Sequence, residues 1–541
     1  MLPSEVWAVV VARAWVGYHA AMTTERKDYA EGEVAAGARD VSGQGEWVPI
    51  IDWSSIFPGN RGINRHGRFE HYDVPAGLAL KVEPGDKSGP ILTAGKPWEF
   101  EDGEGTLVPN TVWRTDHGYH LLYTAHLPER GALGLGGETH MCYATSADGY
   151  TWTRTVLNQV EHNGSTENNI VANAPADSPF LDPQGTPEER FKAIGQVGGA
   201  FFEDSDEKPD PAEVYKHWKQ MEYEGDAYTG RRVVFRHWVE GWTSPDGIHW
   251  TPKGRVADMP SDGGSAAQYD PETKSYFAYL RVGAVGGRRA TGLARTKDFW
   301  HWPQAKLVLC PDPQDPPDLS FYSTMYFRYP SNPKLHCALI ETYNQFADDN
   351  DAQIAFSHDM ENWFRPERRP IIQCGELGEP DAGAARPWGG LFELADGRWA
   401  VVYRGVTGLH NYTRPEGLLD RGPGVLMMAH WLPHRFCGVE AESEGRFTLS
   451  TVVRTQDALR LNYRCGFGGY IIAELIRGVP SRIHPDAEAI PGFAFADCDR
   501  MTGDTLNGMM SWNGNGDLSG IGDTVAIRVR MFRAKLFAYS V

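Results

Sequence analysis

Cysteine is scarce and unpatterned in this sequence, which holds seven cysteines in 541 residues. They stand at positions 142, 310, 337, 374, 437, 465 and 498, and no two form a Cys-x-x-Cys pair. An odd number without such spacing argues against a disulfide framework and against a cysteine-ligated zinc site. The interpretation is a set of reduced, buried thiols, which favours a cytoplasmic protein.

Runs of positive charge and long apolar runs are also missing. The formal net charge is −19, and the absence of a polybasic run argues against nucleic acid and anionic membranes as partners. The apolar stretch at 6–22 follows Glu5 and is interrupted by Arg13. It lacks the basic leader of a signal peptide and is too short to span a membrane. We expect a short N-terminal helix there.

Sequence patterns of several enzyme classes are absent as well. The glycine-rich stretches at 131–137 and 283–289 lack the strand–loop–helix context of a phosphate-binding loop. The chain has no His-Glu-x-x-His pattern, no Cys/His cluster and no evident Ser-His-Asp order. We therefore expect no required cofactor and assign no metal ligand.

One pattern, Ser/Thr-x-Asp-x-x-x-Trp, occurs four times and is called the Ser-Asp-Trp turn below. Its copies begin at Ser146, Ser244, Thr296 and Ser357, each after a short strand-like run. Ser and Asp side chains can hydrogen-bond their own backbone, so each copy predicts a tight turn between antiparallel strands. The Trp that follows is expected to pack on the neighbouring unit. Repeated turns among many short strands are typical of a β-propeller.

The sequence therefore predicts an all-β fold, a five-bladed β-propeller followed by a C-terminal β-sandwich. We assign 1–64 to a helix and connector, 65–443 to the propeller and 444–541 to the sandwich. The fifth repeat lacks the turn, so six blades is the alternative. Residues 61–98 are expected to close the ring by pairing early with late strands.

An insertion lies between the first and second Ser-Asp-Trp turns. Residues 202–231 are acidic and aromatic, and they nearly double the spacing between these copies. Long insertions in propellers gather on one face, so we expect this one at the mouth of the central funnel, where it would shape substrate access.

Several stretches resemble the glycoside hydrolases that join a five-bladed propeller to a β-sandwich, such as invertases and inulinases, whose relatives include arabinanase- and xylosidase-type propellers. The stretches are SPFLDP with RFKAIG, DFWHWP, FSHDMENWFRP, DGRWAVVYRG and the tail RVRMFRAKLFAYSV. The Asn-Asp-Pro-Asn-Gly, Arg-Asp-Pro and Glu-Cys-Pro motifs of invertases are absent. The resemblance implies a glycosidase and admits a calcium ion at the propeller axis.

Glycoside hydrolysis uses two carboxyl groups, one protonated and one ionised. Residues just before the first strand of each blade should converge at the axis. By resemblance in blade order, a blade-one glutamate, best Glu99 but alternatively Glu101 or Glu104, is the nucleophile or base. Asp177 holds sugar hydroxyls and stabilises the transition state, and Asp262 is the acid. Each acid could instead be an ordinary loop carboxylate. Asp182 is expected at a surface turn.

Further residues are candidates for binding the substrate. The arginines follow alternating apolar runs, where the alternative is a structural ion pair. Three tryptophans, Trp98, Trp300 and Trp388, could form a sugar platform or pack in the core. The substrate-binding candidates are Glu104, Arg281, Asp318, Glu379, Arg404 and His410.

The predicted function is hydrolysis of a glycosidic bond in an oligosaccharide or glycoside, with a furanosidic or otherwise unusual sugar. The lost invertase motifs keep a non-catalytic carbohydrate-binding propeller as the alternative. A lyase or an intramolecular transferase on the same scaffold is a third interpretation. The oligomeric state stays open.

Overall fold

The computed structural model describes residues 47–101, 103–127, 138–175, 177–209, 232–259, 261, 264–283, 285–410, 423–450, 454 and 456–541. The predicted N-terminal helix and most of the 202–231 insertion lie outside these ranges. The described residues form strands and four short 3-10 turns, which confirms the all-β prediction. No helix among them is long and apolar enough to cross a membrane. The seven cysteines are free in the structure, and Cys142, Cys337 and Cys437 are buried.

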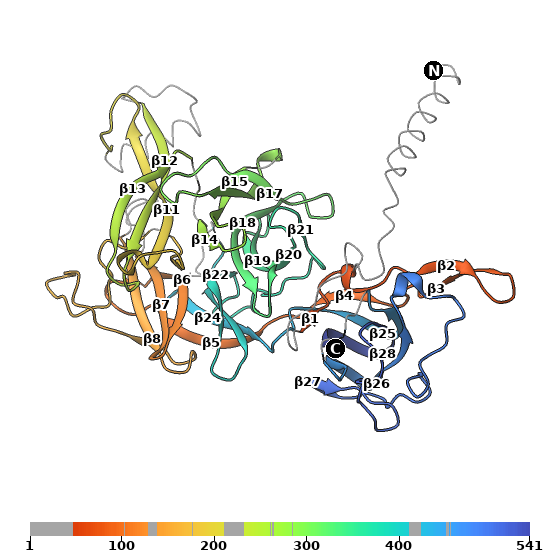
Figure 1. Ribbon diagram of the computed structural model, residues 1–541. Coiled ribbons are helices and arrows are strands. Elements are labelled where there is room, and N and C mark those ends of the chain that lie inside the picture. Colours follow the sequence, from red (N-terminus) through yellow and green to blue (C-terminus); the bar gives the residue numbers. More distant parts are fainter. Residues whose placement is uncertain are drawn as a thin grey trace, which may run out of the picture.

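Three four-stranded sheets follow one another along the chain (Figure 1). In each sheet the strands pair antiparallel with their sequence neighbours. The strands are β6 (Thr106–Thr115), β7 (Gly118–His126), β8 (Thr139–Ser146), β9 (Thr153–Arg154), β10 (Phe180–Leu181), β11 (Phe191–Phe202), β12 (Val233–Ser244), β13 (Thr251–Ala257), β14 (Ala266–Asp270), β15 (Ser275–Gly283), β16 (Arg289–Thr296) and β17 (Lys306–Leu309).

An eight-stranded sheet follows, in which a single parallel pair, Asn350 with Ala384, joins two four-stranded groups. The hydrogen-bonding pattern thus gives four sheets, and the count of five blades stays a prediction. The strands are β18 (Leu319–Tyr329), β19 (Asn332–Asn344), β20 (Asp349–Ser357), β21 (Trp363–Phe364), β22 (Ala384–Glu393), β23 (Trp399–Val406), β24 (Val425–Trp431) and β5 (Asp86–Thr93).

The sheets are arranged around an axis. Strands β6, β10, β14, β18 and β22, the first strand of each group, all line one central cavity of about 400 Å³. This radial arrangement is that of a β-propeller. Strand β5 pairs with β24, so an early strand closes the ring against a late one, as expected.

The four Ser-Asp-Trp turns share the bonds of the Asp and Trp side chains, and the Ser bond described next occurs in the three copies that begin with Ser. In the first copy, Ser146 Oγ accepts from the backbone N–H of Gly149 (2.8 Å), and Asp148 Oδ1 accepts from that of Tyr150 (2.8 Å). The indole N–H of Trp152 donates to the carbonyl of Gly149 (2.9 Å). The other copies repeat the indole bond. The turn is therefore stabilised by its own side chains, as the residue types predict.

Each turn connects the third and fourth strands of a four-stranded group, and the four turns lie in four different sheets, which confirms the repeat. The indole of each turn packs against the preceding group of strands. Trp152 clusters with Phe392 of β22, and Trp250 clusters with Leu122 of β7. Trp302 and Trp363 pack in the same way on β12 and β15.

The C-terminal part contains a six-stranded sheet (Figure 1, blue with orange-red strands). The strands are β25 (Cys437–Thr448), β26 (Arg460–Arg477), β27 (Asp504–Met509), β28 (Val525–Ser540), β4 (Ala79–Val82) and β1 (Val48–Pro49). The predicted boundaries are corrected here. Residues 79–82 pair with β25 and not with the propeller, and β25 begins at Cys437. Early residues complete this sheet because a long edge strand needs a partner.

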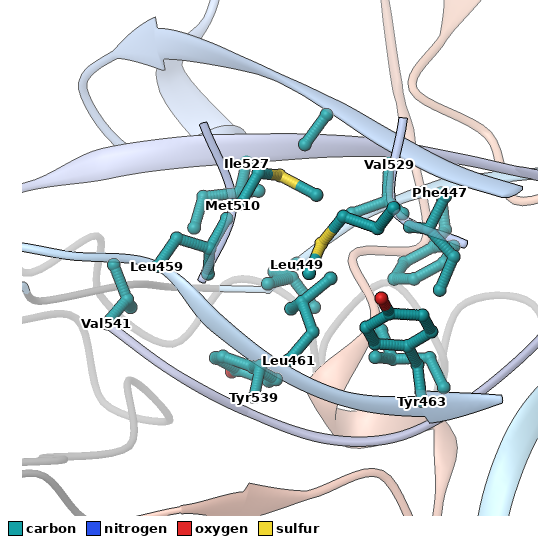
Figure 2. Packing of buried hydrophobic residues seen from close by; sticks show 14 of the residues in the cluster. Phe447, Leu449, Leu459, Leu461, Tyr463, Met510, Ile527, Val529, Tyr539 and Val541 are labelled. Carbon is teal, nitrogen blue, oxygen red and sulfur yellow. The ribbon is translucent and has the colours of Figure 1, made fainter. Parts of the chain in front are cut away.

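The sheet bends on itself. The pairing register shifts in β25 near Ala441 and in β26 near Cys465. Both shifts lie opposite the same stretch of β28, near Phe532. Bulges at one level bend a sheet sharply, so the two halves of each strand face one another, as in a sandwich. Figure 2 shows Leu461 and Tyr539 facing Ile527 and other apolar side chains across the core.

The remaining elements are short. A hairpin of β2 and β3 precedes β4, and single 3-10 turns stand in the loops. Their bounds are β2 (Asn60–Ile63), β3 (Phe69–Tyr72), η1 (Trp53–Ser55), η2 (Pro187–Glu189), η3 (Val285–Gly287) and η4 (Pro480–Arg482).

We expect Trp250→Ala to lower the free energy of unfolding by about 3–5 kcal/mol, because it removes a large buried side chain and leaves a cavity between two sheets. Trp250 is 4% exposed. The control is Trp53→Ala, since Trp53 is 48% exposed and its loss should cost less than about 1 kcal/mol. Denaturant titration measures both, and equal costs would contradict the assigned role of the turn.

Candidate functional site

A cavity lies where the sheets of the propeller converge. It has a volume of about 750 Å³ and receives side chains from β6, β7, β8, β11, β12, β15, β18, β19, β22 and β23. This size is typical of ligand-binding pockets. Asp177, Arg281, Arg404 and Trp388, all predicted from the sequence, line it.

Asp177 stands at the axial start of β10, as the sequence predicts. Its neighbour Ser178 bridges to Ala266, and the backbone N–H of Ser265 approaches Asp177 Oδ2 (3.4 Å). The side chain is 8% exposed. Burial raises the pKa of Asp177 to about 7, against the opposing effects of hydrogen bonds from Ser265 and of the charge of Arg281. Near neutral pH this carboxyl can hold or release a proton.

A second carboxylate, Glu341 of β19, faces the same cavity and was not predicted. Arg386 Nε lies 2.5 Å from its Oε1, Ser323 Oγ donates to its Oε2 (2.6 Å), and Asn350 Nδ2 donates to Oε1 (3.2 Å). These contacts fix both oxygens. The available signal was a charged residue inside the apolar run LHCALIETY, which suits a buried strand only if the charge has partners.

Three arginines line the cavity. Arg386 and Arg404 stand directly opposite each other on β22 and β23, and Arg281 comes from β15. Arg281 Nε donates to the carbonyl of Tyr322 (2.6 Å), and its guanidinium lies 4.0 Å from the centre of the Tyr322 ring. This cation–π contact fixes the side chain at the cavity wall.

His410 lies beside the cavity wall. Its Nε2 is 3.0 Å from Tyr322 Oη and its Nδ1 is 3.4 Å from Arg386 Nη1, so it supports the arginines. His126, which was not predicted, lines the cavity. His126 is exposed to the cavity, where desolvation and the charges of Arg404 and Arg386 lower its pKa.

The prediction for Glu99 is wrong about its place. Glu99 is 0% exposed and does not line the cavity. Arg154 binds it through two contacts of 2.7 Å, and Tyr123 Oη donates to it (2.7 Å). A carboxylate held by an arginine and a phenol in the core is a structural ion pair.

Three other predicted acids, Glu104, Asp318 and Glu379, do not line the cavity. Glu104 is exposed and pairs through its backbone with Glu101. Asp318 accepts from the N–H of Phe346, and Glu379 is exposed and accepts from the N–H of Glu376. Asp262 lies outside the described residues.

The expectation that Asp182 lies at a surface turn is wrong. It is 3% exposed, its carboxylate lies 2.7 Å from Lys192 Nζ, and Tyr276 Oη donates to it (2.8 Å). It is a buried ion pair and not a surface-turn residue. The tryptophans divide as well: Trp388 and the unpredicted Trp242 line the cavity, whereas Trp98 and Trp300 do not.

One group of side chains could hold a metal ion. Among the described residues, Glu138, His140 and His162 bring one ligand atom each within 4.8 Å of the others. His140 also lines the cavity. Two imidazoles and one carboxylate suit a transition metal such as zinc better than calcium, which prefers oxygen ligands.

No protein-family model and no curated protein matches this chain. Several solved structures are similar to it. A thermostable family-43 glycoside hydrolase is 11% identical, with a TM-score of 0.38 over 63% of this chain and 92% of its own. A GH32 beta-fructofuranosidase from Bombyx mori is 11% identical, with a TM-score of 0.36 over 84% and 93%. An N-acetylgalactosamine deacetylase from F. plautii is 14% identical, with a TM-score of 0.37 over 65% and 95%.

We expect Asp177→Asn to stabilise the protein at pH 8. Between the ordinary pKa of 3.8 and about 7, the folded state binds more protons than the unfolded state, so stability falls as the pH rises through this window. Removing the charge should raise the free energy of unfolding by up to about 4 kcal/mol at pH 8 and by little at pH 4.

Denaturant titration at both pH values measures this, with Asp182→Asn as the contrasting variant. That change leaves Lys192 buried without its counter-ion and should destabilise the protein at pH 8 by about 3 kcal/mol. A gain for Asp177→Asn that is equal at pH 4 and pH 8 would contradict a titrating carboxyl.

Proposed function

We propose that this protein cleaves a glycosidic bond in the cavity between its sheets, with Asp177 and Glu341 as the two carboxyl groups. One observation carries the proposal. A buried carboxyl with a pKa of about 7 and a second, ion-paired carboxylate line one cavity of about 750 Å³. Two carboxyls in different environments are what acid–base cleavage of a glycoside requires.

The two carboxyls would have different catalytic roles because their environments differ. Asp177, which burial keeps protonated up to near neutral pH, would donate a proton to the leaving oxygen. Glu341, held by Arg386 and Ser323, would stay ionised and either activate water or stabilise the positive charge that develops on the sugar. This gives Asp177 a different role from the one that the family resemblance implies.

The wall of the cavity offers the remaining contacts. Trp242 and Trp388 supply aromatic surface for the apolar face of a sugar, and the arginines supply donors for its hydroxyls. A furanosidic or otherwise unusual sugar remains the expected substrate. Because the two carboxyls supply both the proton and the negative charge, we expect bond cleavage itself to need no cofactor. A calcium ion at the axis stays a prediction from the resemblance.

A carbohydrate-binding protein without catalysis is the second candidate. The observation that favours it is that both oxygens of Glu341 are engaged by neighbouring side chains. A screen of aryl glycosides and natural oligosaccharides separates the two. Turnover supports the enzyme, and binding without turnover supports the second candidate.

On a substrate found by this screen, we expect Asp177→Asn to lower kcat/KM by at least about 100-fold, the usual size of general acid catalysis. In the wild type, kcat/KM should fall about tenfold per pH unit above pH 7, because Asp177 loses its proton there. The variant should lack this decline.

Asp351→Asn is the matched control. Burial also raises the pKa of Asp351, to about 6, and Thr342 donates to it, but it does not line the cavity. The Asp351→Asn variant should have the activity and the pH profile of the wild type. Full activity in Asp177→Asn would remove Asp177 from the mechanism.

A further inference from the structure

A group of metal-ligating side chains stands at the cavity wall, apart from the residues given catalytic roles. Glu138 and His140 come from the start of β8, and His162 comes from the loop after β9. Glu138 Oε2 lies 3.2 Å from His140 Nε2, and the rings of His140 and His162 are perpendicular with centroids 5.3 Å apart. A zinc ion with bonds of about 2.1 Å places its ligand atoms about 3.4 Å apart, close to the distance between Glu138 and His140, and the third ligand atom lies within 4.8 Å of both.

The fold positions the two histidines. His140 sits in the β7–β8 ladder opposite Ala125. The backbone of His162 exchanges two hydrogen bonds with Ser165 (2.9 and 3.1 Å), and the ring of Trp98 packs edge-on against it at 6.0 Å. Ligands held by a strand and a tight loop lose little freedom on binding an ion.

A ring nitrogen of His162 has a hydrogen-bond donor beside it. The amide Nδ2 of Asn163 lies 3.0 Å from His162 Nε2, a contact in which the ring nitrogen offers a lone pair. A divalent ion would take the place of that amide hydrogen.

We propose that Glu138, His140 and His162 bind one divalent ion of the zinc class, with a further coordination position open toward the cavity. Three protein ligands leave a position for water or for an oxygen of the ligand. Because His140 lines the cavity, this position faces the space that a sugar would fill. The effect of the ion on the sugar rests on the proposed function, whereas ion binding does not.

Calorimetric titration of EDTA-dialysed protein with ZnCl2 tests ion binding in the absence of sugar. We expect one saturable site that weakens at least tenfold in His162→Ala and in Glu138→Gln. The control is His249→Ala: His249 lies 2.7 Å from Asp246 on an exposed turn and belongs to no such group of three. Unchanged affinity in His162→Ala would overturn the site.

Cobalt(II) gives a second readout on the wild type, which does not depend on the folding of a variant. A four-coordinate site of two nitrogens and one carboxylate should give intense visible absorption, and the weak spectrum of a six-coordinate ion would overturn the assignment.

The sugar contact is tested with a substrate from the glycoside screen. Removing the ion should raise KM at least threefold and leave kcat unchanged, because the ion holds a sugar oxygen and takes no part in proton transfer. A loss of kcat at constant KM would overturn this role. If no glycoside is turned over while zinc still binds, the proposed function fails and the ion site stands.

Discussion

Closure of the ring by β5 and β24 is the constraint on which the rest of the structure depends. Strand β5 covers the outer edge of the last sheet, and Lys87 on it forms an ion pair with the buried Asp381 (2.7 Å). The preceding strand β4 pairs with β25, so residues 79–93 connect both sheet systems. Glu83 between them binds Lys535 (2.9 Å) and thereby fastens the connection. A sheet system without this closure would expose a long edge.

The Ser-Asp-Trp turns decide how neighbouring sheets meet. Each turn is rigid because its own side chains satisfy its backbone, and each indole packs on the preceding group of strands. Fixed angles between sheets bring the starts of distant strands together. Asp177, Glu341 and Arg404 are far apart in the sequence and still line one cavity. The turns do not line this cavity, so the residues that stabilise the fold there differ from those that would bind a ligand.

The candidate site carries a cost in stability. Burial disfavours the ionised form of Asp177, and the charge of Arg281 offsets only part of this effect. The opposed arginines Arg386 and Arg404 repel each other, and Glu341 offsets part of this repulsion. Such costs are typical of functional sites, where charge is arranged for a ligand and not for the fold.

Local patterns in the sequence determined the all-β class, the repeated turns, the free cysteines and the axial place of Asp177. These features depend on residues close together in the chain, such as Ser146 and Trp152, whose hydrogen bonds form within one turn. Only the tertiary structure decided which carboxylates face the cavity. Glu99 and Asp182 look like ordinary loop acids in sequence, but Arg154 and Lys192 bind them in the core. Glu341 reaches the cavity from the middle of an apolar strand. The physical reason is that burial and counter-charge come from side chains distant in sequence, so no local pattern contains them.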